Sequence, residues 1–140
     1  MSASRDPLGR KVSKKILIAD DEPNIVAALE FLLQRGGYEV LTAHDGDEAL
    51  RLIEARTPDL VLLDVMMPQK SGYEVCQRIR ERPQWRHIKI MMLSAKGRDA
   101  EVIKGLSMGA DLYVTKPFST RELMTKISGL FELGSQPGPA

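Results

Sequence analysis

Four short apolar runs alternate with stretches of helical spacing, and this pattern constrains the chain to an alternating strand and helix fold. Short apolar runs of this kind are typical of the strands of a parallel sheet. Each run ends in a polar residue suited to phosphate chemistry. The runs and their ends are 16–19 before Asp20 and Asp21, 60–63 before Asp64, 90–93 before Ser94, and 112–115 before Lys116. Ligands of open parallel sheets bind beyond the carboxyl ends of the strands, so we expect these side chains to gather at one edge.

The whole pattern predicts five strand and helix pairs. The third strand is the most continuously apolar, so we place it at the centre of the sheet. Right-handed crossovers put helices on both faces, which predicts a single three-layer α/β domain. The predicted strands are 15–19, 38–43, 59–63, 89–93 and 111–115, and the helices begin near Pro23, Asp45, Gly72, Asp99 and Ser119.

The first and last predicted helices have the clearest sequence signals. Pro23 suits a first turn, and Ser119 with Glu122 matches a capping box. We expect Phe31, which lies outside the apolar stripe of the first helix, to pack against the last helix rather than to form a docking surface. The predicted stripe is Ile25, Ala28, Leu29, Leu32 and Leu33.

The chain divides into one domain and two short ends. Its 140 residues suit a single domain, which we place at 14–132. Residues 1–13 are polar with Pro7 and Gly9, and residues 133–140 are rich in glycine, proline and serine. We therefore expect a flexible leader and a disordered tail.

Composition excludes several classes of function. A formal net charge of +1 gives no electrostatic basis for nucleic acid binding. Cys76 is the single cysteine, so the chain can form neither an internal disulfide nor a multi-cysteine metal site. No apolar run has the length of a membrane span or the form of a signal peptide, so we expect no membrane association and a cytoplasmic location.

The polar strand ends suggest a specific chemistry. Three carboxylates at one edge repel one another unless a cation is bound, and Mg²⁺ (or Mn²⁺) is the hard divalent ion that accepts such oxygens. A carboxylate beside that ion can accept a phosphoryl group, with Lys116 neutralising its charge and Ser94 donating a hydrogen bond. Taken singly, the same residues also fit helix caps, a strand end and a surface lysine. Together they predict phosphorylation on Asp64.

Four segments resemble the receiver domain of bacterial two-component response regulators. The resemblance covers about Lys14 to Glu132, and all four motifs occur in the family's order. They are Ile-Ala-Asp-Asp-Glu at 18–22, Leu-Leu-Asp-Val-Met-Met-Pro-Gln-Lys-Ser-Gly at 62–72, Leu-Ser-Ala-Lys at 93–96, and Gly-Ala-Asp-Leu-Tyr-Val-Thr-Lys-Pro-Phe at 109–118.

The resemblance implies a flavodoxin-like, doubly wound fold with strand order 2-1-3-4-5. It makes Asp64 the phosphoacceptor for a histidine kinase or histidine phosphotransfer protein. Asp21 and Asp64 would bind Mg²⁺ directly, Asp20 largely through a coordinated water, and Met66 through its backbone carbonyl.

The resemblance also implies a conformational switch. Lys116 matches the family's lysine, and its peptide bond to Pro117 is expected to be cis. Ser94 and Tyr113 match a switch pair, in which the hydroxyl moves to the phosphoryl group and the aromatic ring turns inward. The expected output is a remodelled protein-binding face formed by helix 99–108, strand 111–115 and the last helix.

That face raises the question of a phosphorylation-dependent homodimer. Receivers of the winged-helix transcription-factor class usually carry two acidic residues before the switch aromatic and pair through charges there. Here Asp111 is followed by Leu112, which removes one of the expected charges. The partner that binds this face would be a downstream protein, an output domain or a second copy of the chain. The chain itself is either a stand-alone receiver or part of a larger regulator.

Two other functions are alternatives to the interpretation of this chain as a receiver domain. An aspartyl-phosphate phosphohydrolase like the haloacid dehalogenases needs a second acid two positions after the nucleophile, where this chain has Met66. Such enzymes usually carry a cap region as well, for which this length leaves no room. A flavodoxin needs a Ser/Thr/Gly-rich phosphate loop after the first strand, and the chain has none there. We therefore predict a phosphoacceptor switch rather than a turnover enzyme.

Overall fold

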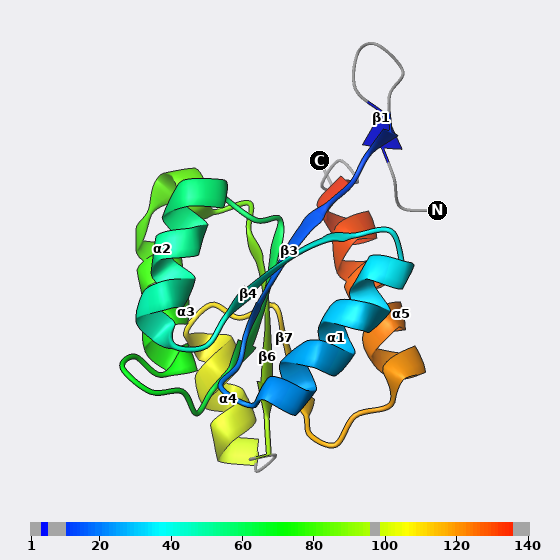
Figure 1. Ribbon diagram of the computed structural model, residues 1–140. Helices are drawn as coiled ribbons and strands as arrows, with labels where there is room; N and C mark the ends of the chain where they lie inside the picture. Colours follow the sequence, from blue (N-terminus) through cyan, green and yellow to red (C-terminus); the bar gives the residue numbers. More distant parts are fainter. Residues whose placement is uncertain (1–3, 6–10, 96–98, 136–140) are drawn as a thin grey trace.

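A five-stranded parallel sheet forms the centre of the molecule. The computed structural model describes residues 4–5, 11–95 and 99–135 (Figure 1). The strand order is β4-β3-β5-β6-β7, which is the expected 2-1-3-4-5 order when the parallel strands are numbered along the chain. The strands are β3 (Lys15–Ala19), β4 (Glu39–Ala43), β5 (Leu60–Asp64), β6 (Lys89–Ser94) and β7 (Leu112–Thr115).

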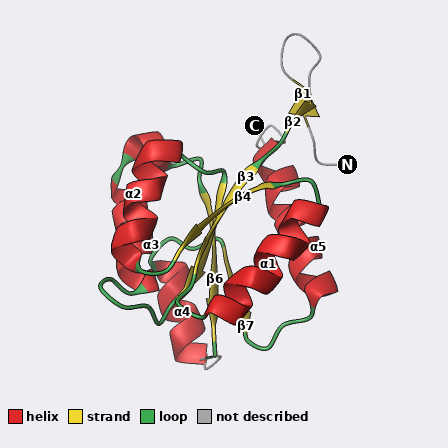
Figure 2. Ribbon diagram, in the orientation of Figure 1, coloured by secondary structure: helices red, strands yellow, loops and turns green. Residues whose placement is uncertain are grey.

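Helices cover both faces of this sheet and confirm the three-layer α/β fold. In Figure 2, α1 and α5 lie on one side of the strands, and α2 and α3 lie on the other with α4. The two core clusters follow the same division, since one contains residues of α1 and α5 and the other contains residues of α2 and α3. The helices are α1 (Pro23–Arg35), α2 (Gly46–Arg56), α3 (Gly72–Glu81), α4 (Asp99–Ser107) and α5 (Thr120–Ser135).

The central strand is β5, as its apolar sequence predicts. All five of its residues are buried, and it pairs with β3 on one side and β6 on the other. The edge strand β4 is only partly buried. A strand covered on both faces needs apolar residues at every position, which explains the unbroken run at 60–63.

The chain ends have more secondary structure than their composition suggests. Within the expected leader, β1 (Ser4–Arg5) pairs antiparallel with β2 (Lys11–Val12). At the other end, α5 continues to Ser135, beyond the predicted domain limit at 132. The remaining parts of the predicted leader and tail, 1–3, 6–10 and 136–140, lie outside the described residues.

Helix starts follow the chemistry of their first residues. Ser71 forms a complete capping box with Glu74 at the start of α3, and the Ser-x-x-Glu spacing at 71–74 is the local signal for it. At α5, the predicted cap is present, because the Glu122 amide donates to Ser119 Oγ at 3.0 Å. Pro83 begins a short 3₁₀ turn that ends at the buried Trp85.

The buried face of α1 differs from the predicted stripe. Val26 is buried, whereas Ala28 is exposed. The expectation for Phe31 is wrong, since its side chain is 62% exposed and the Arg35 guanidinium lies 5.7 Å from its ring centre. The helix turns Val26, Leu29 and Leu33 toward the sheet, so its buried face is rotated relative to the stripe that we chose.

Candidate functional site

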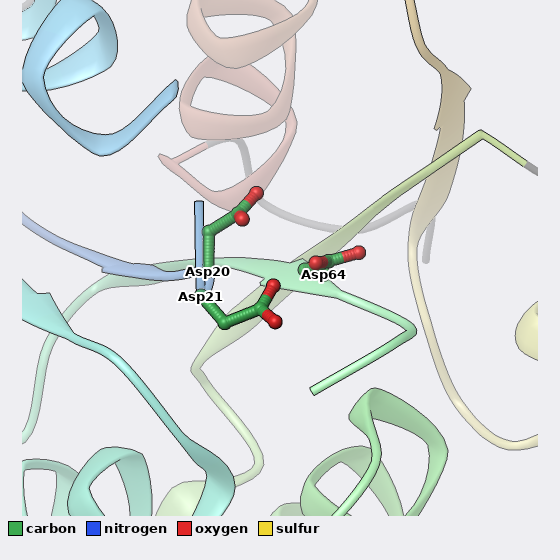
Figure 3. Close-up of side chains that lie close together, drawn as sticks. All are labelled: Asp20, Asp21 and Asp64. Carbon is green, nitrogen blue, oxygen red and sulfur yellow. The ribbon is translucent and has the colours of Figure 1, made fainter. Parts of the chain in front are cut away.

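Three aspartates meet at the carboxyl ends of two neighbouring strands. Asp20 and Asp21 follow β3, and Asp64 ends β5, the strand beside it. Each offers one carboxylate oxygen, and these oxygens lie within 4.8 Å of one another (Figure 3). Asp20 and Asp64 are buried, whereas Asp21 is exposed. The sheet therefore brings together the acids that the sequence placed at strand ends.

Asp20 is held in place from several sides. Its backbone amide donates to the Ala43 carbonyl at 3.1 Å, and its Oδ1 accepts from the Glu22 amide at 2.9 Å. Its other oxygen, Oδ2, accepts from Lys116 Nζ at 2.9 Å. With an exposed fraction of 0%, Asp20 is a fixed acceptor at the base of the site.

Asp64 lies among like charges, and this surrounding perturbs its pKa. Burial and repulsion from Asp20 and Asp21 raise its pKa, while Lys116 and the Met66 amide oppose the rise, and the result is a pKa of about 7. The Met66 amide donates to Asp64 Oδ1 at 3.3 Å. A positive charge close to this carboxylate would relieve the repulsion.

Lys116 lies inside the acidic cluster, and its contacts differ in one respect from the expectation. Its Nζ donates to Glu22 Oε1 at 2.8 Å and to Asp20 at 2.9 Å, whereas Asp64 Oδ2 is 3.8 Å away. Desolvation lowers the pKa of Lys116, but the hydrogen bonds to Glu22 and Asp20, together with the negative charges of Asp64 and Asp20, raise the pKa by more in sum. The ammonium group therefore carries its charge next to the phosphoacceptor candidate.

The backbone around Lys116 joins this lysine to the end of β6. The Lys116 amide donates to the Ser94 carbonyl at 2.8 Å, and Ser94 pairs with Thr115 across the β6–β7 ladder. The peptide bond between Lys116 and Pro117 is cis, which confirms the expectation from the resemblance. Ser94 is fully buried at the edge where Asp64 also ends its strand.

Ser94 and Tyr113 lie on the same face of the sheet. Tyr113 pairs with Met92, and Met92 precedes Ser94 by two residues along β6. Because side chains alternate between faces along a strand, Ser94 and Tyr113 both project toward the side that holds α4. A Cβ atom added at Gly105 of α4 would lie 2.9 Å from the Tyr113 ring, so the helix passes directly over this tyrosine.

A contact that sequence reasoning missed connects this region to α3. The Tyr73 hydroxyl donates to Glu101 Oε2 at 3.0 Å, and the Lys104 ammonium lies 4.4 Å from the centre of the Tyr73 ring. Burial, the hydrogen bond to Glu101 and the proximity of Tyr113 raise the pKa of Tyr73. No local sequence motif predicts the contact between Tyr73 and Glu101, because these residues are 28 positions apart in the chain.

The acids and the lysine surround an open cleft. It is lined by Asp21, Glu22, Asp64, Met66, Ala95 and Lys116. Met66 is 56% exposed at its rim, and the use of its backbone carbonyl as a metal ligand stays a prediction. Three hard carboxylate oxygens beside open solvent are the donor set that Mg²⁺ takes in proteins, where it usually keeps several waters. The residues present therefore fit Mg²⁺.

The chain belongs to the response regulator receiver domain family. The model of the family described as "Response regulator receiver domain" matches residues 16–128. The matched segment contains every site residue described above. The chain is thus a phosphoacceptor receiver domain of two-component signalling.

Individual relatives agree with this assignment. The chain is 43% identical over 129 residues to the alkaline phosphatase synthesis transcriptional regulatory protein PhoP of Bacillus subtilis, covering 92% of this chain and 53% of that protein. It therefore spans about half the length of this curated relative.

Solved structures show the same fold. A response regulator from Chloroflexus aurantiacus is 36% identical, with a TM-score of 0.83 over 86% of this chain and 99% of that chain. A CheY-like receiver from Methanospirillum hungatei is 30% identical, with a TM-score of 0.83 over 91% of this chain and 100% of that chain. Among the described residues, no helix has the length and apolar character needed to cross a membrane.

Proposed function

We propose that Asp64 is the phosphoacceptor of this receiver and that Asp20, Asp21 and Lys116 assist the transfer. The observation that carries the proposal is the placement of Asp64. It is 4% exposed at the end of the central strand, within 4.8 Å of two other carboxylates and 3.8 Å from a lysine ammonium. Such a carboxylate can act as a nucleophile toward phosphorus.

The transfer exchanges one bond to phosphorus for another. A carboxylate oxygen of Asp64 attacks the phosphorus of a phosphohistidine, an O–P bond forms, and the N–P bond to the donor imidazole breaks. The imidazole leaves with the electron pair of that bond and takes a proton from solvent. Mg²⁺, held by Asp21, Asp64 and the Met66 carbonyl and through water by Asp20, would neutralise charge on the phosphoryl oxygens.

Lys116 and Ser94 complete the proposed site. The raised pKa of Lys116 keeps its ammonium charged beside the oxygens that the phosphoryl group brings. Ser94 is the buried hydroxyl at the end of the neighbouring strand, so we assign it the hydrogen bond to the phosphoryl group. Its shared face with Tyr113 supports the assignment of these two residues as the switch pair.

The proposed output is the face formed by α4, β7 and α5. Ile103 is 65% exposed and Leu106 is 42% exposed on α4, the helix that covers Tyr113. A rearrangement of Tyr113 would therefore reach an apolar surface suited to a protein partner. A phosphorylation-dependent homodimer through this face is an alternative use of the same surface, and size-exclusion chromatography with and without phosphorylation distinguishes the two.

The partners follow from the family. Receiver domains take their phosphoryl group from a histidine kinase or a histidine phosphotransfer protein, and we propose such a donor here. We also propose a cytoplasmic location, action on a downstream protein or output domain, and no direct binding of nucleic acid by this chain. The near-zero formal charge of +1 supports the last point.

Intact-mass measurement with acetyl phosphate and Mg²⁺ tests the proposal. The wild type should gain one phosphoryl group that is lost in base, because the carboxylate of Asp64 displaces acetate from phosphorus. Asp64→Asn has nearly the same shape but a weaker nucleophile, and it should gain none. Steady release of phosphate from small phosphomonoesters by the wild type would contradict the switch and favour a turnover enzyme.

A further inference from the structure

Lys116 is shared unequally among three acids. The distances from its Nζ are 2.8 Å to Glu22 Oε1, 2.9 Å to Asp20 Oδ2 and 3.8 Å to Asp64 Oδ2. The lysine is therefore within hydrogen-bonding distance of two acids that are not the proposed phosphoacceptor. A phosphoryl group on Asp64 would compete with these two acids for the donors of the ammonium group.

Glu22 is the partner that can be released. The Asp20 side chain is 1% exposed and is also fixed by the Glu22 amide, whereas the Glu22 side chain is 58% exposed. Glu22 occupies the N-cap position of α1, yet within the described structure its side chain makes no capping hydrogen bond. Among the contacts described, the Glu22 carboxylate therefore binds only Lys116. Because this carboxylate is exposed, water can take the place of the Lys116 ammonium when that group moves away.

We propose that Glu22 is a positioning residue that holds Lys116 away from Asp64 and yields it when a phosphoryl group arrives. This inference rests on the proposed role of Asp64. A phosphoryl group carries nearly two negative charges and three acceptor oxygens, and it therefore outcompetes a single exposed carboxylate for the ammonium. The ion pair between Glu22 and Lys116 is partly solvated, so breaking it requires little free energy. The ammonium group can therefore move from Glu22 to the phosphoryl group.

Three variants distinguish the effect of the contact between Glu22 and Lys116 from a general effect of negative charge on phosphorylation. Glu22→Gln removes the charge and keeps the length of the side chain. Glu22→Asp keeps the charge, but we expect its carboxylate, one methylene shorter, to cap the first turn of α1 and to lie farther from Lys116. Glu54→Gln is the matched control, because Glu54 is an exposed acid that pairs with Arg82 on another part of the molecule.

The first measurement needs neither a metal ion nor a phosphoryl donor. Nuclear magnetic resonance of ¹⁵N-labelled lysine ammonium groups should show a hydrogen-bonded Lys116 signal in the wild type, assigned by its loss in Lys116→Arg. That signal should shift or broaden in Glu22→Gln and Glu22→Asp and stay unchanged in Glu54→Gln. An unchanged signal in both Glu22 variants would overturn the proposed contact, whatever Asp64 does.

The second measurement is the phosphorylated fraction at limiting acetyl phosphate, followed by intact mass. Releasing Lys116 should raise the ratio of phosphorylated to free protein by about two- to fivefold in both Glu22 variants, the size expected for an exposed ion pair. Glu54→Gln should match the wild type, and thermal unfolding should show that every variant is folded.

Each remaining result argues against the proposal in a recognisable way. A rise in Glu22→Gln alone would mean that charge, and not the contact, matters. A fall or no change in both variants would mean that Glu22 does not restrain Lys116. If the wild type itself takes up no phosphoryl group, the proposed function fails, while the Lys116 signal still reports on Glu22.

Discussion

Buried polar residues of this domain lie in two different environments, either at the strand ends beside the cleft or enclosed in the apolar core. Asp20, Asp64 and Ser94 are buried at strand ends, where the sheet edge gives them polar neighbours and access to the cleft. Cys76 lies on the buried face of α3, where its Sγ donates to the Met108 carbonyl at 3.4 Å. A buried thiol in apolar surroundings is chemically quiet, whereas the strand-end carboxylates are poised for reaction.

Cys76 should make the domain less stable at high pH. Burial and Asp111 raise the pKa of its thiol, with Arg80 opposing, from 9.0 to about 11. Between these pH values the unfolded chain ionises first, so the free energy of unfolding falls as the pH rises, by on the order of 2 kcal/mol. Urea unfolding at pH 8 and pH 10.5 measures the loss, and the thiol should react with iodoacetamide at pH 8 only after unfolding.

The control for this effect is Cys76→Ala. It lacks the titrating group, so its unfolding free energy should fall less between the same two pH values, although tyrosines and lysines still ionise. A parallel fall in the two proteins would show that Cys76 does not cause the alkaline loss. Rapid alkylation of the folded wild type would show that the thiol is not sealed in the core.

At the scale of elements, the position of Asp64 depends on how closely α3 approaches β5. A Cβ atom added at Gly72, the first residue of α3, would lie 2.8 Å from the Val65 Cα and closer still to the Asp64 carbonyl. The Gly72 amide also donates to the Val65 carbonyl at 2.9 Å. Glycine is required here by close backbone contact, and this contact helps to fix the strand end that carries the phosphoacceptor candidate.

Gly72→Ala should therefore destabilise the domain by about 1–3 kcal/mol, the usual cost of overpacking, and slow phosphorylation of Asp64. Gly129→Ala on α5 is the matched control, because a Cβ atom there would have no neighbour within 4 Å. That change should instead stabilise by about 0.5–1 kcal/mol through helix propensity. Urea unfolding of both variants decides, and equal effects of the two changes would contradict the close approach.

Elements were more predictable from the sequence than the contacts between them. Strand limits agree within one residue because the apolar runs and Pro58 mark them locally, while Pro83 and the capping residues mark the ends and starts of helices. The buried face of α1 was misjudged at Val26, since both candidate stripes contain apolar residues and only packing decides which one faces the sheet. The pairing of Lys116 with Glu22 depends on side-chain directions across 94 positions, which no local pattern encodes.

On the scale of the whole molecule, the sheet order explains how distant residues form one site. Strands β3, β5, β6 and β7 are consecutive neighbours, so their carboxyl ends bring Asp20, Asp64, Ser94 and Lys116 to one edge. This edge could be predicted, because parallel strands joined by right-handed crossovers align their ends whatever the intervening helices contain. The same arrangement concentrates like charges, which costs stability until a cation is bound.

Mg²⁺ should therefore stabilise the whole domain against unfolding. A ligand that binds only the folded state adds about 2.7 kcal/mol at one hundred times its dissociation constant, or roughly 5–10 °C in Tm for a domain of this size. The unfolded chain does not hold the three carboxylates within 4.8 Å of one another, so it should bind the ion far more weakly. Thermal unfolding across a MgCl₂ series, with ionic strength held constant by KCl, measures the gain.

Asp21→Asn provides the matched variant because Asp21 is exposed and its removal leaves the core intact. Without Mg²⁺ this variant should unfold at a higher temperature than the wild type, since one of three mutually repelling charges is gone. With Mg²⁺ its Tm should rise much less, because a ligand of the ion is lost. An equal rise in both proteins would mean that the ion acts elsewhere on the surface, and a lower Tm of Asp21→Asn without Mg²⁺ would mean that the three carboxylates do not strain the fold.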